Sequence, residues 1–132
     1  MIEVLVWDQK RWPNFKAQEF ACKCGCGING MSPKTLDLCQ DLRRKCGFPL
    51  MITSGYRCPN HNSSVSETGT DGPHTTGEAL DIRVDRKNAH TLLKHALALG
   101  FTGIGVQQKG KVRFIHLDTI DDCLTRPTVW SY

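Results

Sequence analysis

The stretch PHTTGEALDIRV, residues 73–84, decides the expected fold because it joins a turn to a strand. A spacing of seven would place His74 and Asp81 on one side of a helix, but Pro73 and Gly77 disfavour helix formation. From residue 79 onward, apolar and polar residues alternate as they do in a strand. The apolar residues expected to face the core are Leu80, Ile82 and Val84. Asp81 then lies on the opposite face, where a carboxylate on the floor of a cleft needs a partner.

A predicted β-hairpin further along the chain offers such a partner. The segments TGIGV and KVRFIHLD flank the turn-like QQKGK, which is typical of two paired strands. The two-residue period of a strand places His116 and Asp118 on the same face. A catalytic zinc ion takes three protein ligands from histidine and carboxylate and leaves a fourth position to water. His74, Asp81 and His116 match that ligand set.

Two helices and one more strand are predicted from caps and periodicity. Residues 33–46 and 88–99 repeat apolar side chains at helical spacing, and a glycine follows each segment as an expected helix end. Either Asp85 or Asn88 is expected to cap the second helix. The segment LMITS, residues 50–54, predicts a short strand.

Several segments are expected to contribute little to the site. Residues 55–73 are rich in turn-forming residues and predict a long polar loop. His90 and His95 lie off the apolar stripe of the second helix and are expected on the surface. The aromatic residues near the end of the sequence, Trp130 and Tyr132, are expected to pack over the sheet rather than to contact substrate.

Length and composition predict one globular domain over residues 1–132, and we expect a monomer. The net charge of +4 is mild and its basic residues are scattered, which argues against a nucleic-acid-binding surface but suits an anionic polymer such as a cell wall. No apolar run is long enough to cross a bilayer, so membrane insertion is not expected. The first residues lack the pattern of a secretory signal peptide, which predicts synthesis in the cytoplasm.

Seven cysteines are many for such a chain, and an odd number cannot all pair. Cys22, Cys24 and Cys26 are crowded into CKCGCG, whereas the others are scattered. One interpretation is free thiols, several of them buried as small apolar residues; the other is a local metal or disulfide role for the first cluster. The segment CPNHN adds Cys58 and His61, with which the cluster could share a second, structural metal.

Six segments, in order, resemble the zinc D-Ala-D-Ala carboxypeptidases, the L-alanyl-D-glutamate endopeptidases and related phage and bacterial murein peptidases. In that family a histidine is followed by glycine three residues later, alanine two after that and aspartate two further, which here are His74, Gly77, Ala79 and Asp81. SGYR precedes this motif and a His-x-Asp strand follows it. The segments are FKAQEFACKCGCG, MITSGYRCPNHN, HTTGEALDI, GFTGIGV, RFIHLD and RPTVWSY.

The resemblance implies an α+β fold of the hedgehog and D,D-peptidase type, with helices packed on one face of a small antiparallel sheet. It implies that the other face carries zinc, with His74, Asp81 and His116 as ligands. It also places Arg57 of SGYR in the cleft, where a guanidinium would stabilise an oxyanion or hold a substrate carboxylate.

The general base is where this sequence departs from several of the relatives. They carry an acidic residue three positions before the last histidine ligand, a position that is Arg113 here and that points away from the site by strand alternation. Asp118 is the nearest carboxylate, and two roles stay open for it: proton acceptor from the zinc water, or orientation of His116. Glu78 is expected to be a solvated loop acid.

The function expected from this resemblance is zinc-dependent hydrolysis of peptide bonds in peptidoglycan stem peptides, of either carboxypeptidase or endopeptidase type. A phage or prophage lysis enzyme that acts at the cell wall is the expected setting. Two alternatives belong to other classes. One is a non-catalytic, hedgehog-like zinc-binding module; the other is a zinc-ribbon nucleic-acid binder built on CKCGC and CPNH.

Overall fold

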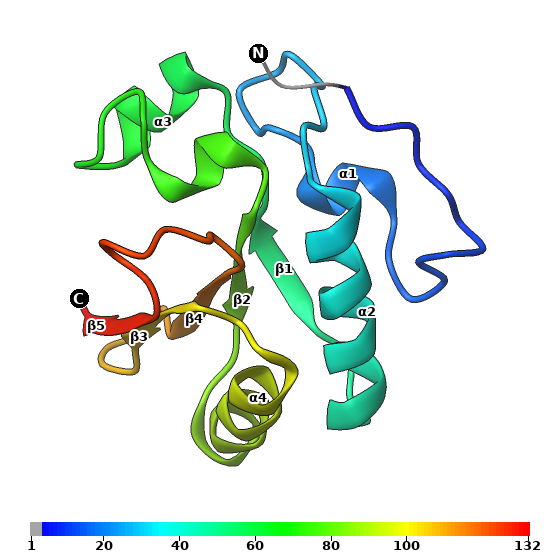
Figure 1. Ribbon diagram of the computed structural model, residues 1–132, viewed down its shortest axis with the longest axis vertical. Coiled ribbons are helices and arrows are strands. Elements are labelled where there is room, and N and C mark those ends of the chain that lie inside the picture. Colours follow the sequence, from blue (N-terminus) through cyan, green and yellow to red (C-terminus); the bar gives the residue numbers. More distant parts are fainter. Residues whose placement is uncertain (1–3) are drawn as a thin grey trace.

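The computed structural model describes residues 4–132, and a five-stranded sheet lies at its centre (Figure 1). The strands lie side by side in the order β1-β2-β4-β3-β5. All neighbours are antiparallel except β3 and β5, which are parallel. The expected α+β class with a mostly antiparallel sheet is thereby confirmed. The strands are β1 (Met51–Ser54), β2 (Ala79–Arg83), β3 (Gly103–Gln107), β4 (Phe114–Asp118) and β5 (Thr128–Ser131).

The predicted hairpin and the strand from residue 79 form the middle of this sheet. The register pairs Asp81 of β2 directly with His116 of β4. On the other side of β4, Gly103 of β3 pairs with Asp118. Strand β5 was not predicted, because it pairs in parallel with β3 and therefore has no hairpin turn to reveal it.

The two predicted helices form as α2 (Pro33–Cys46) and α4 (Arg86–Leu99). Gly47 and Gly100 end them in the left-handed conformation, with φ of 73° and 94°, which glycine adopts without steric cost. Of the two cap residues considered for α4, Asp85 is the one at the N-cap position.

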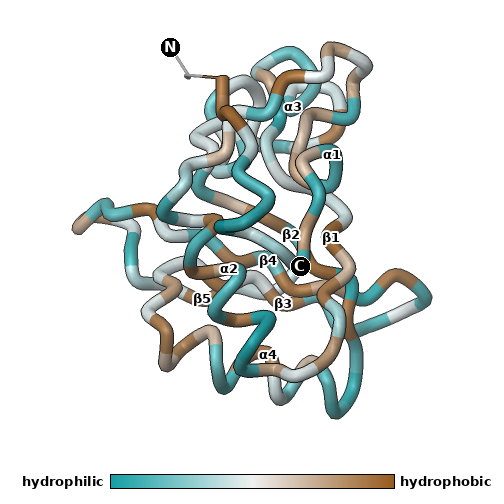
Figure 2. The backbone as a smooth tube through the Cα atoms, turned by 90° about the vertical axis from the view of Figure 1, so that its right-hand side faces the viewer, coloured by the Kyte–Doolittle hydropathy of each residue, from teal (hydrophilic) through white to brown (hydrophobic). Residues whose placement is uncertain are grey.

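Helices α2 and α4 cover one face of the sheet and form the core with it. Figure 2 shows hydrophobic and hydrophilic stretches alternating along α2, as expected for a helix with one buried face. The opposite face of β2 and β4 is therefore free to carry polar side chains. The fully buried side chains of this core include Leu36 and Leu42 of α2, Leu92 of α4, Leu80 and Ile82 of β2, and Ile115 and Leu117 of β4.

The long loop predicted for residues 55–73 is wrong, since this segment contains α3 (Pro59–Val65) and meets a 3-10 helix, η1 (Pro73–Thr76). Proline occupies the first turn of each, where its missing N–H costs nothing. The turn after α3 is held by Asn62, a buried side chain whose amide donates to the hydroxyl of Thr68 and to a backbone carbonyl. The polar composition of residues 55–73 therefore gave no sign of their ordered structure, which depends on the buried side-chain amide of Asn62.

The short helix α1 (Ala17–Phe20) was also not predicted. It buries Phe20 against the core, and the backbone N–H of Tyr56 donates to the Phe20 carbonyl at 2.8 Å. A bulkier residue than Gly55 would not fit here, because a Cβ atom would lie 2.7 Å from the Phe20 backbone. Within residues 4–132, no helix is both long and apolar enough to cross a membrane.

The core predicts a large difference between two leucine substitutions. Leu42→Ala removes a side chain with no exposed surface and should lower the free energy of unfolding by about 2–5 kcal/mol. Leu97→Ala, at a position of α4 that is 64% exposed, is the matched control and should change it by less than about 0.5 kcal/mol. Urea unfolding followed by circular dichroism measures both values. Equal effects would mean that α2 does not pack as described.

Candidate functional site

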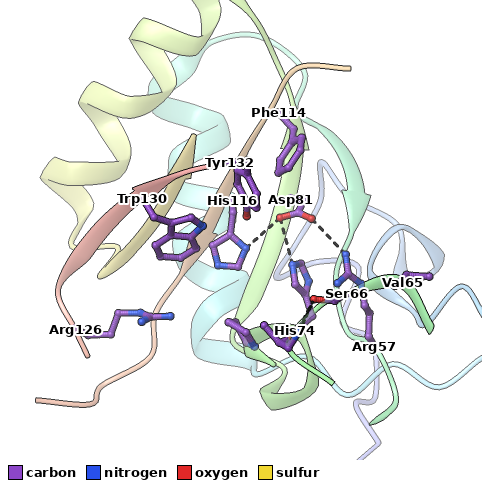
Figure 3. Close-up of a pocket in the computed structure, with 12 residues that line it drawn as sticks. Arg57, Val65, Ser66, His74, Asp81, Phe114, His116, Arg126, Trp130 and Tyr132 are labelled. Carbon is purple, nitrogen blue, oxygen red and sulfur yellow. Dashed lines mark hydrogen bonds and ion pairs between the residues drawn. The ribbon is translucent and has the colours of Figure 1, made fainter. Parts of the chain in front are cut away.

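A cavity of about 450 Å³ opens on the face of the sheet opposite α2 and α4 (Figure 3). Its floor is formed by Asp81 of β2 and His116 of β4, and His74 of η1 lies beside them. Val65 and Ser66, at the end of α3, form one wall. The aromatic side chains of Trp130, in β5, and of Tyr132, directly after β5, lie on the other side.

His74 is held in the cavity by a bond to the backbone. Its Nδ1 lies 2.8 Å from the Gly55 carbonyl oxygen, so Nδ1–H donates and Nε2 is left facing the cavity. Nε2 lies 3.3 Å from Oδ1 of Asp81. The backbone also connects these segments, because the N–H of Arg57 donates to the His74 carbonyl at 3.1 Å.

Asp81 is the point where the three predicted ligands converge. Its Oδ1 lies 3.1 Å from Nδ1 of His116, and one donor atom from each of the three side chains lies within 4.8 Å of the others. Burial raises the pKa of the Asp81 carboxyl, but hydrogen bonds from His116 and His74 outweigh burial and lower it below its usual value. Two imidazoles therefore face one ionised carboxylate.

Asp118 lies on the far side of the His116 ring and does not line the cavity. Its Oδ2 accepts from Nε2 of His116 at 2.8 Å, and both oxygens accept from the guanidinium of Arg126 at 2.9 Å. Burial raises the pKa of this carboxyl, but its bonds to His116 and Arg126 lower it overall. A Cβ at Gly103 would lie 2.2 Å from the carboxylate, so glycine is required beside it.

The pair of carboxylates fixes the orientation of the His116 ring. Burial lowers the pKa of His116, but hydrogen bonds to Asp118 and Asp81 raise it overall. Because Asp118 holds Nε2–H, loss of the other ring proton would leave Nδ1 as a ligand toward the cavity.

Arg57 lines the cavity, as expected from SGYR. Its Nη2 lies 3.6 Å from Oδ2 of Asp81, which is longer than a good hydrogen bond. Nε donates to the Ser54 hydroxyl at 3.1 Å, and Nη1 donates to the Asn62 side-chain oxygen at 3.2 Å. The end of β1 and the helix α3 thus orient a guanidinium whose remaining N–H groups are free for a substrate.

Two aromatic residues near the end of the sequence, Trp130 of β5 and Tyr132 directly after it, line the cavity. They also pack over the sheet as expected, since a Cβ at Gly105 would lie 2.6 Å from the Trp130 indole nitrogen. The Trp130 ring lies 5.0 Å from that of His116, measured between centroids. Sequence reasoning gave no role to Arg126, which also lines the cavity, although RPTVWSY contained it.

Two other residues weighed from the sequence lie outside the cavity. Arg113, at the position where several relatives are acidic, donates from Nε to the Gly110 carbonyl at 3.1 Å and faces a different surface. Glu78 is half-buried rather than fully solvated, and burial raises its pKa. Among residues 4–132, Asp81 is therefore the single carboxylate that lines the cavity.

A comparison with protein-family models matched residues 13–118, more than half of the 132 residues, to Peptidase M15. The chain belongs to the Peptidase M15 family. A comparison with curated proteins found no match. The match begins before α1 and ends at Asp118, so it contains all three converging side chains as well as Arg57.

Membership of Peptidase M15 supports a zinc-dependent metallopeptidase. The donor set fits that metal, since His and carboxylate side chains bind zinc and three of them leave a position open. Membership also argues against a zinc ribbon that binds nucleic acid, because the family match covers the segments on which that alternative rested.

Substitution of one of the converging histidines should remove one metal ion. His116→Ala should lower the zinc content by about one ion per chain relative to the unaltered protein, because two remaining ligands bind zinc weakly. His90→Ala, on the exposed side of α4, should leave it unchanged. Mass spectrometry of the metal content after dialysis against dilute zinc measures both. Unchanged zinc in His116→Ala would exclude the cavity as a metal site.

Proposed function

We propose that this chain is a zinc metallopeptidase that hydrolyses peptide bonds in peptidoglycan stem peptides, with His74, Asp81 and His116 as the metal ligands. The observation that carries the proposal is the convergence of these three side chains in a cavity of a Peptidase M15 domain. When bound there, zinc would supply a polarised scissile carbonyl and a more acidic water. The protein itself would bind and orient the peptide.

We propose that Arg57 binds a negatively charged oxygen of the substrate. This is either the scissile carbonyl oxygen, on which charge develops during the reaction, or a carboxylate that the peptide already carries. Its guanidinium is fixed by Ser54 and Asn62, so little conformational freedom is lost when it donates to a substrate oxygen. Stem peptides offer both a scissile carbonyl and free carboxylates. Binding of the carbonyl oxygen would favour internal cleavage, and binding of a terminal carboxylate would favour release of the last residue.

Of the two roles open to Asp118, we propose the orientation of His116. The carboxylate is fully buried and lies outside the cavity. Its Oδ2 accepts from His116 and Arg126, and its Oδ1 accepts from Arg126. These contacts suit a residue that fixes a ligand's tautomer and ring orientation. Asp118 is thus a positioning residue, and Arg126 offsets its buried charge.

The cell wall is the proposed site of action, in the setting of phage or prophage lysis. The net charge of +4 supports this proposal, because a basic protein is attracted to an anionic wall polymer. The non-catalytic, hedgehog-like module remains the second candidate. It is favoured by one observation, that Asp81 is the single carboxylate lining the cavity within residues 4–132.

Digestion of purified peptidoglycan separates these candidates. The proposal predicts new stem-peptide fragments in mass spectra, lost on treatment with a chelator and restored by zinc. Fragments shorter by a terminal D-Ala would establish carboxypeptidase action, and internal fragments would establish endopeptidase action. Intact peptidoglycan bound by zinc-loaded protein would instead support the binding module.

Substitution of Arg57 tests the proposed charge stabilisation. Arg57→Ala should lower kcat about 10²–10³-fold, the effect of removing one donor to a developing oxyanion. Arg113→Ala, which removes an arginine outside the cavity, is the control and should retain activity. Initial rates on a defined stem peptide measure both. Equal activity of Arg57→Ala and the unaltered protein would remove Arg57 from the mechanism.

Substitution of Asp118 tests the positioning role. Asp118→Asn should weaken zinc binding at the cavity about 10–100-fold, because His116 loses its charged partner. A role as general base alone would instead lower kcat and leave zinc affinity unchanged. Competition with a zinc-binding dye measures the affinity, and a thermal unfolding curve shows whether the variant is folded.

A further inference from the structure

Four cysteine sulfurs lie together outside the cavity, where the segment 21–28 meets the start of α3. The Sγ atoms of Cys22 and Cys24 are 3.4 Å apart, those of Cys24 and Cys58 are 3.6 Å apart, and those of Cys22 and Cys58 are 3.7 Å apart. With Cys26, all four sulfurs lie within 4.8 Å of one another. The nearby His61, which the sequence suggested as a ligand, is not among this group.

These distances fit a metal ion better than a disulfide. Bonded sulfurs lie about 2.05 Å apart. Four sulfurs at about 2.3 Å from a tetrahedral zinc ion lie about 3.8 Å from one another, which follows from the geometry of the tetrahedron. The observed 3.4–3.7 Å separations are close to that value.

A backbone N–H group contacts the cluster. The N–H of Cys58 donates to the Cys22 sulfur at 3.3 Å. Such an N–H group partly offsets the negative charge of a thiolate.

Glycines make the tight turns of this segment accessible. Gly25 and Gly27 have φ of 96° and 72°, a region that residues with a side chain rarely adopt. Each glycine follows a cysteine, so the chain can reverse and direct successive sulfurs to one point. The spacing of CKCGCG is explained by this geometry.

We propose that Cys22, Cys24, Cys26 and Cys58 bind one zinc ion as a structural tetrathiolate site, separate from the cavity. Thiolate ligands favour zinc, and four protein ligands leave no open position for water or substrate. The neutral thiols release their four protons to the buffer when the ion binds, so no oxidant or reductant is needed.

The proposed tetrathiolate site would stabilise the side of the cavity on which Arg57 lies. Cys58 directly follows Arg57 and is the N-cap residue of α3, the helix whose Asn62 holds the Arg57 guanidinium. The other three ligands come from the segment after α1. A bound ion would therefore connect two segments far apart in the sequence directly beside Arg57, in addition to the backbone hydrogen bond from Tyr56 to Phe20.

The first experiment counts metal ions. Protein purified under reducing conditions and dialysed against dilute zinc sulfate should contain about two zinc ions per chain, and Cys58→Ser should contain about one. Cys123→Ser, which removes an exposed cysteine outside the cluster, is the matched control and should retain both ions. Equal zinc in Cys58→Ser and the control would overturn the proposal, as would a mass lower by the two hydrogens of a disulfide within the cluster.

The second experiment uses cobalt(II) chloride and does not depend on the cavity. His116→Ala, loaded with cobalt, should show the intense near-ultraviolet absorption of thiolate-to-cobalt charge transfer. The double variant His116→Ala/Cys24→Ser should bind cobalt more weakly and lose much of that absorption. Absence of the band in folded His116→Ala would overturn the proposal. Because the cavity is disabled in both variants, neither result depends on peptidase activity.

Discussion

The buried carboxylate of Asp81 is the constraint on which the rest of the site depends. A carboxylate withdrawn from water is costly unless charged or hydrogen-bonding groups surround it, and here His74, His116 and Arg57 do so. The register of β2 and β4 fixes Asp81 and His116 opposite each other on neighbouring strands. His74 comes from η1, and its ring donates to the backbone carbonyl of Gly55. Any shift of β2 by one residue would turn Asp81 into the core and separate the group.

The segment beyond β4 completes this arrangement from the other side. Arg126 offsets the charge of Asp118, Asp118 orients His116, and Trp130 packs beside the same ring. Gly103 and Gly105 allow this close approach because they place no side chain between β3 and the groups above it. The N-terminal part of the chain contributes through the segment around Cys22, which lies against the residue following Arg57. Segments from both the N-terminal and the C-terminal parts of the chain therefore support the cavity in which His74, Asp81 and His116 converge.

Much of this arrangement could be predicted from the sequence, because its signals are local. Alternation identified β2 and placed Asp81 opposite the core, and the two-residue period placed His116 beside Asp118. The helices α2 and α4 followed from apolar spacing and terminal glycines. What was missed depends on contacts between distant segments. The order of residues 55–73 rests on the buried Asn62 amide, and β5 rests on parallel pairing with β3. The contact of Arg126 with Asp118 likewise had no local signal.

The central claim is that one metal ion joins His74, Asp81 and His116. Diffraction from zinc-soaked crystals, recorded above and below the zinc absorption edge, tests it most directly. The account predicts an anomalous peak within ligating distance of Nε2 of His74, a carboxylate oxygen of Asp81 and Nδ1 of His116. A map with no peak in that cavity, at a zinc concentration that saturates other sites, would contradict it.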